Sequence, residues 1–139
     1  MRRVLALLLT LTGTPAWAHP HIFIETGLTL QVDAEGRLQA VHVVWVYDEL
    51  TSLLAIEDLG LDRDADGRLT DDERAVLDAL AGDWGEEFNG DLVVRAGAAD
   101  LTLSGPETPR GDLREGRVVF SHTRRVTGAP LGDVVLTAF

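Results

Sequence analysis

Alternating apolar and polar positions predict that the chain opens with a β-hairpin. Residues 22–24 and 28–32 alternate as in a strand, and residues 33–36 carry the Asp and Gly typical of a turn. Residues 38–47, rich in valine and aromatic side chains, then form the returning strand. Trp45 and Tyr47 are expected to pack within the sheet.

Short apolar runs return after Trp84 and predict further strands. They are separated by Gly, Pro and Asp, and residues 105–116 are expected to form a polar loop. The predicted strands cover residues 92–94, 101–103, 118–120 and 134–136.

Between these two regions the pattern changes to that of helices, with a first helix predicted over residues 49–59. Leu54 and Leu61 fit the apolar positions of an EF-hand entry helix. Glu57 and Asp58, however, stand where apolar residues usually face the core.

A second helix is predicted over residues 71–81. Val76, Leu77 and Leu80 make one apolar face, and Gly82 ends the helix. The fold class is therefore α+β: an antiparallel β-sheet with an EF-hand-like helix–loop–helix, residues 48–82, inserted after the first hairpin.

The loop joining the two helices, residues 62–73, fits the calcium-loop pattern D-x-[DN]-x-[DN]-G-x5-E at every specified position. Calcium takes oxygen ligands, and Gly67 provides the sharp turn that such loops need at their sixth position. The expected ligands are four carboxylates, one backbone carbonyl and one hydroxyl, direct or through water: Asp62, Asp64, Asp66, Glu73, Arg68 and Thr70.

The alternative is a solvated acidic turn leading into a helix. Thr70 and Glu73 make a capping box, and acidic residues suit the positive end of a helix dipole. This reading does not explain Asp62, Asp64 and Asp66, because three carboxylates this close repel each other unless a cation lies among them. The pattern favours a calcium site.

The first 18 residues have the features of a cleavable secretory signal peptide. A basic start is followed by an apolar run too short to span a bilayer and by the cleavage signal Ala16-Trp17-Ala18. The mature part, residues 19–139, is long enough for a single domain. With no cysteine, this exported chain is expected in a bacterial periplasm or at the cell surface.

The formal net charge of −11 limits the possible partners. An acidic surface disfavours nucleic acid and anionic membranes and favours cations. No other stretch is apolar enough for membrane insertion after the signal is removed.

His19-Pro20-His21 stands at the predicted mature N-terminus. In an extended segment both imidazoles point the same way, and hairpin pairing would bring Asp48 and Glu49 close to them. Two histidines with a carboxylate such as Glu49 suit Zn²⁺, Ni²⁺, Co²⁺ or Cu²⁺. The alternative is a polar, frayed terminus without a metal.

The other two histidines give weaker signals. His42 lies among valines in a predicted strand and is expected to be a half-buried residue rather than a ligand. His122, between Phe120 and Arg124, is interpreted in the same way.

The His19–Ile24 segment after a leader, the residues Trp45–Glu49 and the Asp-rich loop together resemble the periplasmic family called domain of unknown function 1007. The resemblance extends from the leader to about Glu73. It implies a substrate-binding-like component of a transport system that works with a nickel, cobalt or zinc permease. Family members usually continue past residues 134–139 into further sheet, so the resemblance also implies that this C-terminus is truncated.

Three function classes follow. The first is a periplasmic metal-binding accessory protein of a transition-metal transport system, with a structural calcium ion. The second is a calcium-stabilised interaction module without a transition metal. The third, a metalloenzyme, has no support from a catalytic triad order, an H-E-x-x-H helix or a paired-carboxylate motif. We therefore expect the chain not to be an enzyme.

Overall fold

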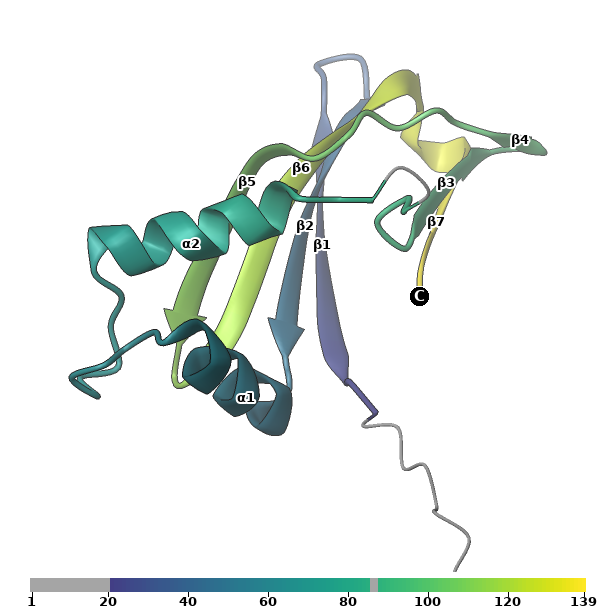
Figure 1. Cartoon of the computed structure of the whole chain (residues 1–139). Coiled ribbons are helices and arrows are strands. Elements are labelled where there is room, and N and C mark those ends of the chain that lie inside the picture. The colour runs from purple at the N-terminus through teal and green to yellow at the C-terminus, as the bar shows by residue number, and fades with distance from the viewer. Residues whose placement is uncertain (1–20, 86–87) are drawn as a thin grey trace, which may run out of the picture.

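The computed structural model describes residues 21–85 and 88–139, and for residues 127–131 only the backbone. The predicted signal peptide and His19 lie outside the described residues. The described residues form two antiparallel sheets and two helices, which confirms the α+β class, and Figure 1 shows their arrangement.

The larger sheet has four antiparallel strands in the order β1-β2-β6-β5. The predicted hairpin is confirmed by the pairing of β1 with β2. Its turn is fixed by Asp33, whose carboxylate accepts the N–H groups of Glu35 and Arg37 at 3.1 and 2.8 Å. The strands are β1 (Ile24–Val32), β2 (Arg37–Tyr47), β5 (Glu107–Arg114) and β6 (Arg117–Pro130).

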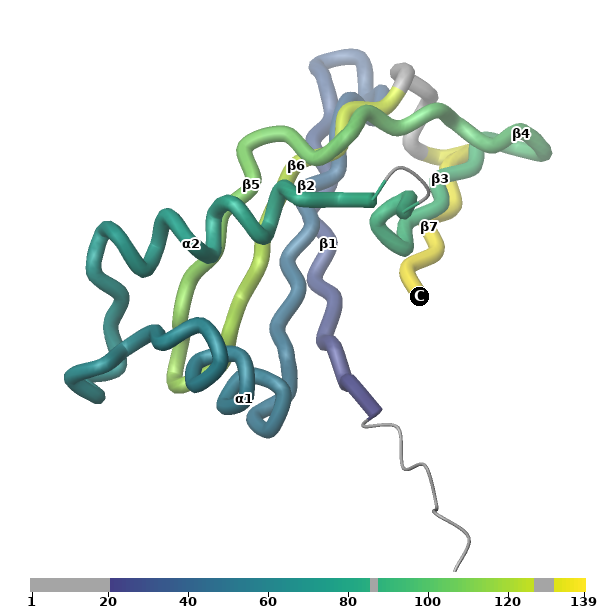
Figure 2. The backbone as a smooth tube through the Cα atoms, viewed as in Figure 1, coloured from purple at the N-terminus to yellow at the C-terminus, as the bar shows by residue number. Residues whose placement is uncertain are grey.

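The smaller sheet has three short strands in the order β4-β3-β7. They are β3 (Leu92–Ala96), β4 (Ala99–Asp100) and β7 (Val134–Ala138), the last preceded by a 3₁₀ turn, η1 (Leu131–Asp133). As the tube in Figure 2 shows, the C-terminal segment returns to lie beside β3.

Two sequence predictions about residues 101–116 were wrong. Residues 105–116 are not a loop, because Glu107–Arg114 forms the edge strand β5. The strand expected over residues 101–103 is reduced to one isolated bridge between Leu103 and Val126.

The two helices are α1 (Glu49–Leu59) and α2 (Asp71–Gly82), close to their predicted bounds. The helices and the small sheet pack on the same face of the large sheet. Alternate residues of β2 point to this face and belong to two hydrophobic clusters, one shared with the small sheet and one shared with the helices. Val43 contacts the small sheet, and Tyr47 packs against the helix side. No helix among the described residues is long and apolar enough to cross a bilayer.

The faces of the helices differ from those predicted. On α2 only Leu77 of the expected apolar face is buried, while Val76 and Leu80 are exposed. Leu61 is buried as expected, but Leu54 of α1 is 46% exposed. These side chains are exposed because the sheet lies under only one side of each helix, and no described element covers the other side.

Candidate metal centre

Apolar anchors fix both ends of the loop between α1 and α2. α1 ends in a Schellman arrangement, with Gly60 in the left-handed region (φ 62°) and the Leu61 N–H donating to the Ile56 carbonyl at 2.9 Å. Leu61 is buried, and Leu69 packs against the same hydrophobic cluster. The acidic residues therefore lie on a segment whose two ends are held by the core.

The backbone between these anchors is tightly turned. Asp62, Ala65 and Gly67 all have positive φ, at 47°, 56° and 76°. The left-handed conformation is costly for residues with a Cβ, so the turn at Ala65 stores strain that the surrounding structure must hold. The Gly67 N–H donates to both carboxylate oxygens of Asp62, at 3.1 and 3.2 Å, which closes the loop on itself.

This turn gathers three carboxylates. Asp62, Asp64 and Asp66 each offer an oxygen, and these oxygens lie within 4.8 Å of one another. Asp66 also accepts the Arg68 N–H at 2.8 Å, which orients its side chain. Like charges at this separation disfavour the arrangement unless a cation compensates them. The donor set is all oxygen and therefore fits a hard cation such as Ca²⁺.

Thr70 and Glu73 form the predicted capping box at the start of α2. Glu73 Oε2 accepts from both the N–H and the hydroxyl of Thr70 at 2.8 Å, and Thr70 Oγ1 accepts the Glu73 N–H at 3.3 Å. These bonds from Thr70 lower the pKa of Glu73 below its usual value, with smaller contributions from the N–H groups of Arg63 and Asp62. Glu73 thus lies at the mouth of the loop as a carboxylate, but it is bonded to Thr70 and is not among the three gathered carboxylates.

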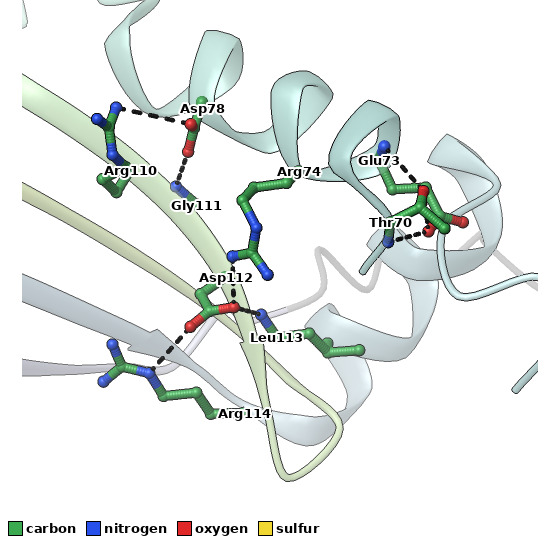
Figure 3. A network of polar contacts seen from close by, with 9 residues as sticks. All are labelled: Thr70, Glu73, Arg74, Asp78, Arg110, Gly111, Asp112, Leu113 and Arg114. Carbon is green, nitrogen blue, oxygen red and sulfur yellow. Dashed lines mark hydrogen bonds and ion pairs between the residues drawn. The ribbon is translucent and has the colours of Figure 1, made fainter. Parts of the chain in front are cut away.

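A polar network fixes α2 on β5 (Figure 3). The Asp78 carboxylate accepts the Gly111 N–H at 2.7 Å, and Arg74 Nη1 contacts Asp112 Oδ1 at 2.9 Å. At Gly111 the helix approaches so closely that an added Cβ would lie 2.2 Å from Leu77 Cβ. The exit side of the loop is therefore set by the packing of α2 and not by the loop alone.

The carboxylate of Asp112 is central to this network. Partial burial opposes its ionisation, but the hydrogen bonds from Arg74 and the Leu113 N–H outweigh that effect and lower its pKa. Asp112 also contacts Arg114 Nε at 3.5 Å. Partners on both α2 and β5 thus favour the charged form of Asp112.

The N-terminal histidine segment is pinned to the start of α1. The Phe23 N–H donates to Asp48 Oδ2 at 3.0 Å, and the Asp48 N–H donates to the Phe23 carbonyl at 2.9 Å. His21 is exposed two residues earlier, and its ring centroid lies 6.4 Å from that of Phe23. The segment carrying His21 thus reaches the neighbourhood of Asp48, as the hairpin pairing predicts.

The carboxylate of Asp48 is already committed as the N-cap of α1. It accepts from the N–H and the hydroxyl of Thr51 at 2.9 and 2.7 Å, in addition to the Phe23 N–H. These bonds, with those from Thr51 the strongest, lower the pKa of Asp48 to about 2. The neighbouring Glu49 is exposed and makes no ion pair with a described residue.

Among the described residues, the three loop aspartates form the only grouping of three potential metal-ligating side chains. His21 and Glu49 lie at the other end of α1 and are not part of it. His19 lies outside the described residues, so its assignment as a ligand stays a prediction.

Two buried polar residues have clear structural roles: Ser52, which the sequence did not single out, and His122, which is more deeply buried than the half-buried position predicted for it. Ser52 is fully buried, and its hydroxyl accepts the Val118 N–H at 2.9 Å, which ties α1 to β6. His122 is also buried, with its ring 4.8 Å from Trp45 and 4.7 Å from Trp84. Its inward position follows from alternation with Phe120, a signal that the sequence contained.

Comparison with known proteins gives one result. A family model described as "Protein of unknown function (DUF1007)" matches residues 4–132. No match was found among curated proteins or among solved structures. Because the match covers most of the chain, this protein belongs to the DUF1007 family.

Proposed function

We propose that this chain is a periplasmic metal-binding accessory protein of a transition-metal transport system, with a structural Ca²⁺ in the loop between α1 and α2. The observation that carries the proposal is the convergence of Asp62, Asp64 and Asp66 to within 4.8 Å on a loop with both ends anchored. The proposal assigns no reaction to the chain.

The calcium site would be EF-hand-like. Calcium takes six to eight oxygen ligands at about 2.3–2.6 Å, more than three carboxylates can supply. The backbone carbonyl of Arg68 and the hydroxyl of Thr70 would add two, and Glu73 would complete the set by exchanging its bond to Thr70 for the ion. A lone loop of this kind should bind in the ~10⁻⁴–10⁻³ M range of extracellular modules.

The transition-metal site would use His19 and His21, with Glu49 as the carboxylate. In its support, the chain just after His21 is held at the start of α1 by two hydrogen bonds between Phe23 and Asp48. Imidazole and carboxylate ligands without thiolate suit Zn²⁺, Ni²⁺, Co²⁺ or Cu²⁺. The partner would be a membrane permease that receives this ion.

The second candidate is a calcium-stabilised periplasmic interaction module without a transition metal. It is favoured by Asp48, whose carboxylate is already occupied by three hydrogen bonds and has little capacity left for a metal. The two candidates separate on whether stripped and refilled protein holds one kind of metal or two.

Thermal melting with and without calcium tests the shared part of both candidates. An ion bound only by the folded state raises the melting temperature, by an amount that grows with its concentration over Kd. The double variant Asp62→Ala with Glu73→Gln should lose this rise. The matched control, Glu57→Gln with Asp58→Asn, removes two charges from α1 and should keep it. An unchanged calcium response in the loop variant would exclude the loop as the site.

A further inference from the structure

The outer face of α1 is apolar and uncovered. Leu50, Leu53 and Leu54 are 63, 59 and 46% exposed, and their spacing places them together on one side of the helix. Phe23, 70% exposed, lies near the N-terminal end of α1, where its backbone N–H is hydrogen-bonded to the capping residue Asp48. These four residues are called the α1 surface below. Contiguous exposed apolar side chains of this kind mark interaction sites.

The α1 surface is not a by-product of loose packing. The inner side of the helix is fixed by the buried Ser52, which bonds to β6, and by Ile56, which packs in the core. Both ends of α1 are capped, by Asp48 and by Gly60. The leucines are therefore presented by a rigid helix.

The charges that α1 itself carries are acidic, and Arg117 of β6, which lines the same pocket as Glu49 and Leu50, is paired with Glu25. Glu49, Glu57 and Asp58 are exposed on α1, and none of them forms an ion pair with another described residue. Glu57 lies one turn from Leu53 and Leu54, so its carboxylate borders the apolar stripe directly. α1 carries no basic residue.

This charge pattern selects among possible occupants. A second copy of the chain would bring the same carboxylates to the interface, where like charges oppose association. An anionic membrane surface would be repelled in the same way. A partner segment with apolar side chains flanked by Lys or Arg would bury the leucines and meet the unpaired carboxylates.

We propose that the α1 surface docks a basic amphipathic helix of a partner protein. The i, i+3, i+4 arrangement of the leucines forms a ridge that suits the groove of a second helix. The apolar contacts would carry most of the affinity, and the rim of carboxylates would give selectivity and salt dependence. None of Leu50, Leu53 and Leu54 is a proposed metal ligand.

Calorimetric titration with a synthetic amphipathic Leu/Lys peptide tests this docking, with a Leu/Glu peptide of the same pattern as the charge control. The protein should bind the Leu/Lys peptide and not the Leu/Glu peptide. The double variant Leu50→Gln with Leu53→Gln should weaken binding by about tenfold or more, because a few central apolar residues carry most of the affinity of an interface. Val135→Gln removes an apolar residue of similar exposure on β7 and should bind as the parent does.

Charge neutralisation forms the second arm. Glu57→Gln with Asp58→Asn should weaken Leu/Lys binding severalfold and flatten its dependence on salt, because rim charges act through screened electrostatics. All titrations are run both with calcium and with a chelator. If the protein binds the peptide but shows no response to calcium, only the calcium site is refuted.

Four results would overturn the docking proposal. The first is that the parent protein does not bind the Leu/Lys peptide, and the second is that it binds the Leu/Glu peptide equally well. The third is that the leucine variant binds the Leu/Lys peptide as the parent does. The fourth is that the parent sediments as a dimer whereas the leucine variant sediments as a monomer. The last result would show that the α1 surface is an interface between copies. Circular dichroism of each variant confirms that the exposed substitutions leave the fold intact.

Discussion

His122 should make this protein lose stability in mild acid. Its imidazole is 1% exposed, and neither ring nitrogen has a hydrogen-bond partner among the described residues. Trp45 and Trp84 pack against it, and Arg124, whose guanidinium lies 5.0 Å from the Trp84 ring, adds a positive charge nearby. Burial first, and then the charges of Arg124 and His42, lower the pKa of His122 from 6.5 to about 4.

The sign and size of this stability change follow from the linkage between folding and protonation. Because the folded-state pKa is the lower one, the unfolded chain binds more protons, and stability is lost as the pH falls from about 6.5 towards 4. A shift of this size costs about 3 kcal/mol when complete. When the pH falls from about 7 to about 4.5, the free energy of unfolding should decrease by about 2 kcal/mol, which is most of the full effect.

Urea unfolding followed by circular dichroism at both pH values measures the effect. His122→Leu keeps a side chain of similar volume and removes the titrating group, so it should lose about 2 kcal/mol less than the parent over this interval. His21→Gln, which removes an exposed imidazole, should behave as the parent does. If His122→Leu and the parent lose the same stability in acid, His122 is not held neutral by burial.

Three further predictions concern packing and linkage. Gly111→Ala should cost about 1–3 kcal/mol in urea unfolding, because its Cβ would overlap Leu77, whereas Gly105→Ala has open space and should be near neutral. Asp48→Ala should lower the melting temperature, since it removes the α1 cap and the bond to β1; the carboxylate's contribution is present above its ordinary pKa of 3.8 and is lost as the pH falls towards about 2. Calcium should tighten Zn²⁺ or Ni²⁺ binding by about 1 kcal/mol in calorimetry, and the double variant His19→Ala with His21→Ala should abolish transition-metal binding while calcium binding remains.

Local sequence signals predicted the elements whose stability is local. The turn at Asp33 and the capping box of Thr70 with Glu73 are each recognised by side chains within a few residues. The acidic loop was predicted from its spacing in the same way, and the structure brings its three carboxylates together. In these places the chain contains most of what determines its conformation.

The edge strand β5 could not be predicted this way, because its support comes from distant residues. Its sequence is charged and irregular, with Thr108 at φ 48° and a register shift between Glu107 and Arg110. β5 is held in place by pairing with β6, by the hydrogen bond that Arg74 of α2 donates to Asp112, and by the Asp78 carboxylate, which accepts the Gly111 N–H. Composition therefore indicated a loop where tertiary contacts make a strand.

α1 was hard to orient for a related reason. A helix that is apolar on several sides is usually buried, and its pattern alone does not say which side faces the core. In the structure, Ser52, which bonds to β6, and Ile56, which packs in the core, form the inner side of α1, and the leucines face outward. Burying a serine while exposing leucines reverses the usual preference. Packing alone does not account for that reversal, since the core gains nothing from exposed leucines. A partner that covers Leu50 and Leu53 would account for it.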